Sequence, residues 1–376
     1  MILYIFLFLC LIILLFQIYI KIKYPFWSRQ PVFHYHNLYY WLFPCGKLDY
    51  EFKINKYFES TIQFIEYKDM TDKKKALICR FLRENYAPYT FEYYNPPNNG
   101  IINYLEGHNR ACYISIYDIL DTKGTITSIP FEVFMDKEMI NMYYIDFLCV
   151  KKKYRNKGYA SKIIYSHVFN THNTKETTVS IFKREGNLSS YVPLTVYNSY
   201  IFDTKHWVKN ASFQDNKYQL INMKNANMSI LNDIFEEIFD TNIFDCVYKS
   251  NINNLSILIE NNHLLIFVLM IDNIPCATYI YKNNYVSYEN SICIDLIGSY
   301  SNTSDELFTM GYLNTLAKLS NSIRYDYLLI ENISHNHILL KKVLERYSFK
   351  YKVDMGYYFY NYVSTPFLSS KVFCIT

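Results

Sequence analysis

The chain has 376 residues, of which 51% are hydrophobic, so a wholly disordered protein is excluded and one large core or two fused domains are expected. The net charge is only +4 and the basic residues are dispersed, which excludes a basic arm that tracks nucleic acid. The nine cysteines form no C-x-x-C pair, so we expect reduced, structural thiols.

Residues 1–20 contain no charged side chain and one strongly polar side chain, Gln17. About 20 apolar residues suffice to cross a bilayer as a helix. The segment lacks the basic start and small-residue cleavage site of a signal peptide, so it is predicted to be an uncleaved, single-pass membrane anchor. Because Lys21 and Lys23 follow at once, the positive-inside rule places the rest of the chain in the cytosol.

The region after the anchor begins with an aromatic-rich arm over 21–48 and continues with alternating elements. Apolar residues at helical steps predict a helix over 75–86. Runs rich in β-branched and aromatic residues then predict strands, with one helix between the last two. The predicted ranges are strands 112–119, 124–134 and 142–150, a helix from 156 to about 170, and a strand over 177–182.

The second half of the chain repeats this rhythm of strands and helices. The predicted elements are a hairpin of strands 264–271 and 274–282, strand 293–299, helix 304–323, strand 327–330, helix 337–347 and strand 351–363. Two successive units of antiparallel strands with crossover helices predict a duplicated α+β fold.

The most informative stretch is 144–160, which reads YIDFLCVKKKYRNKGYA. A strand runs into a short basic turn and then into a helix, and Arg155, Gly158 and Ala160 fit the pattern R-x-x-G-x-A. Free amide groups at a helix start and the helix dipole attract a pyrophosphate. Small residues admit the anion close to the backbone, and Arg155 and the lysines supply charged contacts.

The alternative for this stretch is a basic turn that merely joins a buried strand to a helix. The motif alone leaves both interpretations open, because short glycine-containing motifs have many false matches.

The histidine pairs His34-x-His36 and His335-x-His337 do not indicate a metal site. A spacing of two puts such side chains on different faces of a helix, and no third ligand accompanies them, so we predict no metal site.

The strand–turn–helix resembles the coenzyme A site of the GNAT acetyltransferase superfamily, and the run IDFLCVKKKYRNKGYA resembles more specifically that of eukaryotic N-myristoyltransferases. Further segments resemble the same family in the same order: YPFWSRQPV over 24–32, LRENY over 82–86 with FEY over 91–93, GTITSIP over 124–130, and YYFYNY over 357–362. That family folds as two fused GNAT-like halves. The resemblance thus implies an acyl-CoA-binding half over 49–207 and a peptide-binding half over 208–376.

The resemblance implies a monomeric enzyme that moves a myristoyl group from myristoyl-CoA to the N-terminal glycine amine of a peptide or protein. The backbone N–H groups of Phe147 and Leu148 would stabilise the oxyanion. The residues implied to hold the cofactor are Tyr24, Phe26, Trp27, Phe147, Leu148, Cys149, Val150, Arg155, Asn156, Lys157, Gly158, Tyr159 and Ala160. The residues implied to hold the peptide are Phe91, Tyr93 and Asp354. For the aromatic arm, an interfacial belt beside the anchor is the alternative.

The family uses its terminal α-carboxylate as the base, which here implies the carboxylate of Thr376 after the apolar run 372–375. The alternative is an ordinary terminal strand that ends at the surface. The chain also departs from the family: the tail is about one residue shorter, and Ala87-Pro88-Tyr89 replaces an acidic loop. Two other classes therefore stay open, an acetyltransferase that uses acetyl-CoA on another amine and a non-catalytic membrane-anchored scaffold.

Overall fold

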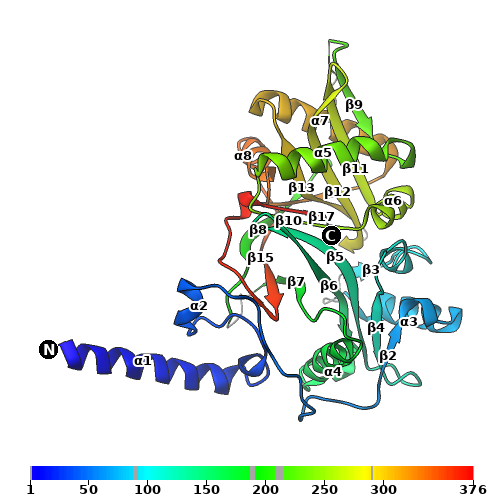
Figure 1. Cartoon of the computed structure of the whole chain (residues 1–376). Coiled ribbons are helices and arrows are strands. Elements are labelled where there is room, and N and C mark those ends of the chain that lie inside the picture. Colours follow the sequence, from blue (N-terminus) through cyan, green and yellow to red (C-terminus); the bar gives the residue numbers. More distant parts are fainter. Residues whose placement is uncertain are drawn as a thin grey trace.

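The computed structural model describes residues 2–87, 92–186, 191–207, 213, 215–288 and 291–375. Within this part of the chain, one sheet of 15 strands forms the centre of the molecule, and a two-stranded sheet pairs β1 with β16 (Figure 1). The main path of the large sheet has the order β17-β10-β5-β6-β7-β15-β8-β14-β13-β12-β11-β9, with β4, β2 and β3 attached beside it.

The strands are β1 (Gly46–Lys47), β2 (Ile62–Glu66), β3 (Glu92–Tyr94), β4 (Tyr113–Tyr117), β5 (Gly124–Met135), β6 (Glu138–Val150), β7 (Ser180–Glu185), β8 (Thr195–Asp203), β9 (Tyr218–Asn222), β10 (Cys246–Ser250), β11 (Leu264–Ile271), β12 (Ile274–Tyr288), β13 (Ser291–Ser301), β14 (Tyr327–Glu331), β15 (Tyr351–Tyr360), β16 (Tyr362–Val363) and β17 (Val372–Ile375). The helices are α1 (Ile2–Lys23), α2 (Leu38–Leu42), α3 (Asp72–Asn85), α4 (Tyr159–Asn173), α5 (Met228–Thr241), α6 (Ile252–Glu260), α7 (Asp305–Ser322) and α8 (Asn336–Leu344).

The helices bury the apolar stripes that the sequence displays. In α3 the buried side chains include Ile78, Phe81 and Leu82, which recur at helical steps. α7 begins where the Ser304 hydroxyl accepts a hydrogen bond from the Leu307 N–H at 3.3 Å. α4 packs on β4, β5 and β6, and α7 packs on β9 and β12. The helices thus cover sheet surfaces that would otherwise expose apolar side chains.

Two β-α-β units give the fold its repeated character. β6 and β7 run parallel and are connected through α4, and β13 and β14 run parallel and are connected through α7. The prediction of a mixed α+β fold is therefore confirmed. The two units share one sheet, because β15 lies between β7 and β8 and β17 pairs with β10. The division of the chain at 207/208 stays a prediction.

Strands β6 and β7 separate part of the way along their length. Their pairing covers only Tyr143–Ile145 opposite Ser180–Phe182, whereas β6 continues to Val150 and β7 to Glu185. Beyond these pairs β7 is bonded on its other side, to β15. The opening between the two strands makes room for a ligand inside the sheet.

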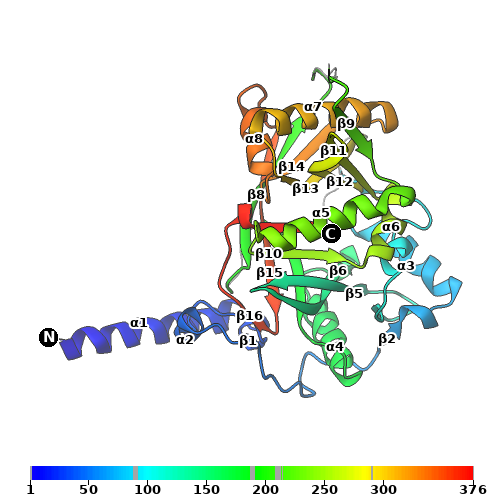
Figure 2. The same cartoon turned by 45° about the horizontal axis from the view of Figure 1, so that its top comes forward.

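Helix α1 projects from the rest of the molecule in both views (Figures 1 and 2). Crossing a bilayer takes about 20 consecutive apolar residues. Among the described residues, no helix is both long and apolar enough to span a membrane. The predicted anchor over 1–20, and with it the single-pass membrane localisation facing the cytosol, is therefore wrong.

Candidate functional site

A β-bulge distorts β6 where the strand reaches the opening. Thr125 of β5 pairs with Cys149 and Thr127 pairs with Asp146, so Ile126 alone lies opposite Phe147 and Leu148. Phe147 adopts a positive φ of 48°, which is unusual for an aromatic residue. A bulge leaves its extra residue outside the regular ladder and re-aims the backbone. The bulge therefore places the backbone amide groups of Phe147 and Leu148 beside the opening between β6 and β7.

Two threonines of β5 fix the bulge. The Thr127 hydroxyl donates to the Asp146 carbonyl at 3.0 Å, and the Thr125 hydroxyl donates to the Phe147 carbonyl at 3.2 Å. The Phe147 N–H donates to Oδ1 of Asp146 at 2.7 Å. The carbonyls of Asp146 and Phe147 are thus satisfied, and the Phe147 amide is held by the Asp146 side chain.

An apolar cavity of about 300 Å³ lies on one side of the bulge. Its wall combines β6 with α4, β7 and the N-terminal arm. The lining side chains that are apolar or aromatic include Trp27, Ile126, Ile145, Leu148, Ile164, Val168, Phe182 and Tyr360. A cavity of this composition can hold a hydrocarbon chain, because apolar surface gains free energy on leaving water.

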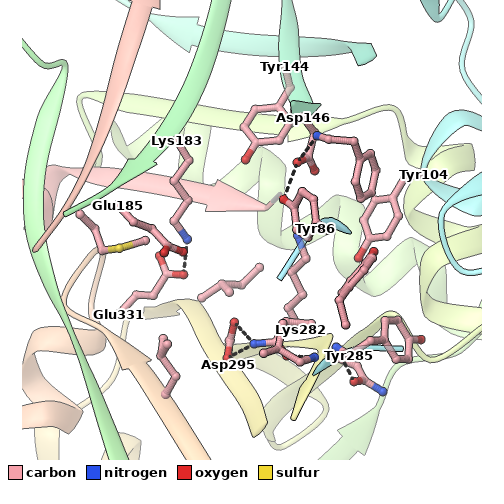
Figure 3. A pocket seen from close by; sticks show the side chains of 18 of the residues that line it. Tyr86, Tyr104, Tyr144, Asp146, Lys183, Glu185, Lys282, Tyr285, Asp295 and Glu331 are labelled. Carbon is pink, nitrogen blue, oxygen red and sulfur yellow. Dashed lines mark hydrogen bonds and ion pairs between the residues drawn. The ribbon is translucent and has the colours of Figure 1, made fainter. Parts of the chain in front are cut away.

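A polar cavity of about 240 Å³ lies on the other side. Figure 3 shows Tyr86 and Asp146 facing one another on one wall, with Lys183 and Glu331 on another. The charged side chains that line it are Asp146, Lys183, Glu185, Lys282, Asp295 and Glu331. Asp146, Lys183 and Glu185 line the apolar cavity as well, so the two cavities meet at the bulge.

Two of these carboxylates have fixed partners. Glu331 is buried, pairs with the Lys183 ammonium at 2.5 Å and accepts the Tyr197 hydroxyl at 2.6 Å. Burial is the largest single effect and acts to lower the pKa of Lys183, but the charge and the hydrogen bond of Glu331 together with nearby negative charges outweigh it, so the pKa is raised. Both Asp295 oxygens accept from the Asn284 amide at 2.8 Å.

Burial also shifts the pKa values of other side chains that line the polar cavity. Burial, together with the Glu331 charge, raises the pKa of Asp295 to about 6, whereas burial lowers the pKa of Lys282. Burial raises the pKa of Tyr86 well above its usual value, and the Asp146 charge acts in the same direction. The tyrosine hydroxyls are therefore neutral hydrogen-bonding groups at neutral pH.

The basic turn after β6 leads into α4 through Gly158. Gly158 adopts a positive φ of 80° and precedes the helix without a side-chain cap. A Cβ at this position would meet nothing within 4 Å, so the space in front of the helix is open. The first amide groups of a helix have no intrahelical partner, and the exposed Lys157 stands beside them. This end of α4 can hold an anion.

Arg155, predicted to contact phosphate, points inward. Its guanidinium donates to the carbonyl of Val150 at 3.1 Å and to the carbonyl of Asn85 at the end of α3. Asn156 adopts a positive φ of 60° in the same turn. Cys149 is buried, and burial raises the pKa of its thiol to about 12, so it is not a nucleophile. Arg155 therefore shapes the turn from inside.

The N-terminal arm reaches the apolar cavity through Trp27. Trp27 lines the cavity and stacks on Phe182, with their ring centroids 5.9 Å apart. Phe26 is buried and contacts Trp27 edge to face at 5.1 Å. Tyr24 lies half-buried at the end of α1, and Tyr159 of α4 packs on Tyr117. Of the predicted arm residues, Trp27 lies at the cavity itself.

The predicted peptide-binding residues fall beside the polar cavity. Tyr93 is exposed, whereas its neighbour Tyr94 lines the cavity. Asp354 is exposed and accepts the Asn198 amide at 2.6 Å, whereas its neighbour Met355 lines the cavity. Successive strand residues face opposite ways, so the predictions miss the lining by one residue. Phe91 lies outside the described residues.

The predicted base, Thr376, also lies outside the described residues. The strand that precedes it, β17, is buried along its whole length and pairs in parallel with β10. The Cys374 thiol contacts the carbonyl of Ile297, a residue that lines the polar cavity. The terminal strand therefore lies in the core, so the alternative of a surface strand is excluded for 372–375.

Sequence reasoning did not single out Lys183, Lys282, Asp295 or Glu331. Asp295 interrupts the apolar run ICIDLIG, Lys282 and Glu331 follow the runs TYIY and YLLI, and Lys183 follows SIF and begins the charged run KRE. A charge in such a run is a signal of a buried polar site, because burying it is costly without a partner. No group of three or more His, Cys, Asp or Glu side chains suited to a metal occurs in the described part of the chain.

Comparisons with known proteins give the same picture of the fold. No family model matches the chain. A protein of Amsacta moorei entomopoxvirus that carries the name glycylpeptide N-tetradecanoyltransferase is 24% identical over 211 residues, which cover 54% of this chain and 70% of that protein.

Two solved structures of Saccharomyces cerevisiae N-myristoyltransferase with bound myristoyl-CoA match almost the whole chain. One has a TM-score of 0.73 at 11% identity and covers 94% of this chain and 99% of its own. The other has a TM-score of 0.72 at 12% identity and covers 93% of this chain and 94% of its own. At such identities the likeness shows the fold, which is the N-myristoyltransferase fold.

Proposed function

We propose that this chain is a glycylpeptide N-tetradecanoyltransferase, which moves a myristoyl group from myristoyl-CoA to the N-terminal glycine amine of a peptide or protein. The observation that carries the proposal is the bulge at Phe147, where an apolar cavity meets a charged one. The fold of the yeast enzyme, matched over 94% of this chain, and the viral relative support it.

The acyl-CoA would bind through the first half of the chain, 49–207. The apolar cavity would hold the acyl chain, with the aromatic arm residues Tyr24, Phe26 and Trp27 as its cover. The thioester carbonyl would lie at the bulge, where the N–H groups of Phe147 and Leu148 stabilise the oxyanion that forms on attack. Metal chemistry is not needed for this step.

The phosphates of coenzyme A would bind at the start of α4. The open space at Gly158 and the first amide groups of the helix suit a pyrophosphate. The residues of this proposed site are Cys149, Val150, Arg155, Asn156, Lys157, Gly158, Tyr159 and Ala160. Arg155 acts within it by holding the turn on the carbonyls of Val150 and Asn85.

The acceptor peptide would enter through the polar cavity, built in part by the second half, 208–376. Tyr93 and Asp354 are exposed next to cavity-lining neighbours, so we assign them to the outer part of the peptide path, together with Phe91. The carboxylate of Thr376 would act as a base, and the buried position of β17 beside Ile297 supports this assignment.

A transfer assay tests the proposal. The purified chain is incubated with labelled myristoyl-CoA and a peptide that starts with glycine, and we expect label on the peptide. The same peptide with an acetylated N-terminus is the control and should stay unlabelled. Because each buried CH₂ contributes about 0.8 kcal/mol, myristoyl-CoA should bind far more tightly than acetyl-CoA. Equal binding, or no transfer to any of a broad set of glycine peptides, would contradict the proposal.

A further inference from the structure

We propose that Asp146 is a second proton acceptor of this reaction, which holds the ammonium of the acceptor glycine and takes its first proton. This inference rests on the proposed function. It concerns a residue that precedes the oxyanion donors and that the resemblance does not assign to catalysis.

The chemistry requires two proton acceptors. The acceptor nitrogen enters as an ammonium and leaves as an amide with a single hydrogen, so two protons depart from it. The first must leave before attack, because an ammonium has no lone pair. The second leaves as the amide forms. The coenzyme A thiolate can accept one of the two protons as it leaves, so a basic group close to the thioester must take the other before attack.

Asp146 stands where that group must be. Its side chain lines both cavities, at the point where an amine in the polar cavity would meet a thioester in the apolar one. Oδ1 accepts the Phe147 N–H at 2.7 Å and lies 3.4 Å from the Tyr86 hydroxyl (Figure 3). The Thr127 hydroxyl fixes the Asp146 carbonyl, so the residue is placed by the bulge itself.

The other carboxylates of the polar cavity are less suited. Glu331 is neutralised by Lys183 at 2.5 Å. Both oxygens of Asp295 accept from Asn284, which holds this carboxylate against β12. Glu185 also lines both cavities, but its side chain is exposed, so water competes for it. Asp146 is half-buried, and its side chain has only the Phe147 amide and the Tyr86 hydroxyl as hydrogen-bonding partners among the described residues.

The proposed reaction transfers two protons and exchanges a C–S bond for a C–N bond. The ammonium gives one proton to the Asp146 carboxylate, and the neutral nitrogen attacks the thioester carbonyl carbon. The C–N bond forms, the C–S bond breaks, and the coenzyme A thiolate leaves with the electron pair. The second proton passes by way of the Thr376 carboxylate to that thiolate, and Asp146 returns the first proton to water once the products have left. A protonated Asp146 is a weaker acceptor, so it releases the Phe147 N–H to the oxyanion when the donor is needed.

The charged and titratable groups around Asp146 set the pH range for a test. They are Tyr86 after α3, Tyr94 of β3, Tyr104 after β3, Tyr144 of β6, Lys183, Arg184 and Glu185 of β7, Lys282, Tyr285 and Tyr288 of β12, Asp295 of β13, Glu331 of β14 and Tyr360 of β15. Burial raises the pKa of Tyr86, Tyr94 and Tyr104 well above the usual value. Asp295, with a pKa of about 6, titrates just below neutrality. The window from pH 7 to 9 therefore avoids it.

The test compares the full chain with Asp146→Asn, which keeps the side-chain shape. We expect kcat at pH 7 to fall about 100-fold, the low end of a general-base contribution, while acyl-CoA affinity is unchanged. The rate of the variant should rise toward pH 9, because an α-amine with a pKa of about 7.7–8.0 loses its own proton there. Asp146→Glu should recover part of the rate. Asp272→Asn, an exposed turn residue outside both cavities, is the matched control for a lost charge.

Two further measurements keep the outcomes separate. A chain extended by one residue after Thr376 should also lose kcat, but without the recovery at high pH that marks Asp146→Asn. If Asp146→Asn keeps kcat within about threefold with an unchanged pH profile, the proposal is overturned. If the wild-type chain transfers no acyl group, the proposed function fails. The Asp146 proposal is then tested by a binding measurement. The protein is loaded with a non-reactive ketone analogue of myristoyl-CoA, and the affinity for the glycine peptide is compared between the wild type and Asp146→Asn. Equal affinities would reject the Asp146 proposal.

Discussion

At the scale of single residues, Gly158 decides whether the start of α4 can accept an anion. Its φ of 80° suits glycine, and the space that a side chain would occupy is open. Gly186 at the end of β7 has a φ of 78° and the same open surroundings. The two glycines therefore share a conformation and differ in what lies beside them, since only Gly158 adjoins the amide groups of a helix.

Replacing Gly158 with alanine should separate strain from ligand binding. A left-handed conformation costs a non-glycine residue roughly 1–2 kcal/mol, so both Gly158→Ala and Gly186→Ala should lower the free energy of unfolding by about that amount. Only Gly158→Ala puts a methyl group in the proposed phosphate site, so only this variant should weaken coenzyme A binding, about tenfold or more. Denaturant titration and calorimetry measure the two effects. Equal coenzyme A affinity in both variants would contradict the phosphate site.

The sequence predicted the position of single residues best where neighbours along the chain lie at the same place in the fold. Trp27 and the pair Phe147–Leu148 line the apolar cavity as expected. Tyr93 and Asp354 miss the polar cavity by one residue, because the register of a strand decides which of two neighbours faces inward. The register depends on pairing partners such as β12 and β7, which are far away in the sequence.

At the scale of elements, the bulge in β6 converts a regular strand into a candidate oxyanion site. The amides of Phe147 and Leu148 leave the ladder because two residues oppose Ile126 alone. The bulge is held by hydroxyl groups from β5, one on each of its carbonyls. The position of the donors thus depends on the neighbouring strand.

The variant Thr127→Val removes one of these hydroxyl contacts at nearly constant volume. A lost hydrogen bond of this kind costs about 1 kcal/mol and frees the Asp146 carbonyl, so we expect kcat to fall several-fold with little change in myristoyl-CoA affinity. Thr278→Val on β12 is the matched control, because its buried hydroxyl has no partner among the described residues. The control should be as stable as the wild type or more stable. An unaltered kcat in Thr127→Val would argue against the bulge as the oxyanion site.

At the scale of the whole molecule, the N-terminal arm meets the end of β15 in the core. The Asn361 N–H donates to the Pro31 carbonyl at 2.7 Å, and the Tyr360 hydroxyl donates to Gln30 at 2.8 Å. Val32 and Phe33 of the arm are buried. The arm, which we propose to cover the apolar cavity, is therefore fixed by the C-terminal strands, and α1 extends outward from it (Figure 2).

Two truncations should distinguish the arm from the helix that precedes it. Removing residues 1–19 takes away mainly exposed side chains, so the unfolding midpoint should change little. Removing residues 1–44 also deletes Trp27 and the buried contacts of Val32 and Phe33, so it should lower the midpoint clearly and weaken myristoyl-CoA binding at least tenfold. Thermal unfolding and acyl-CoA titration check both. Full acyl-CoA affinity without the arm would show that it does not cover the cavity.

The sequence by itself determined the mixed α+β rhythm, the strand–turn–helix around Arg155 and the aromatic arm, because these depend on local periodicity and on motifs within a few residues. The polar cavity depends instead on β6, β7, β12, β13 and β14, which only the pairing of distant strands brings together. Only the tertiary structure therefore showed that Lys183, Asp295 and Glu331 face Asp146. A charge acquires a role from its burial and its partners, and neither is a property of the local sequence.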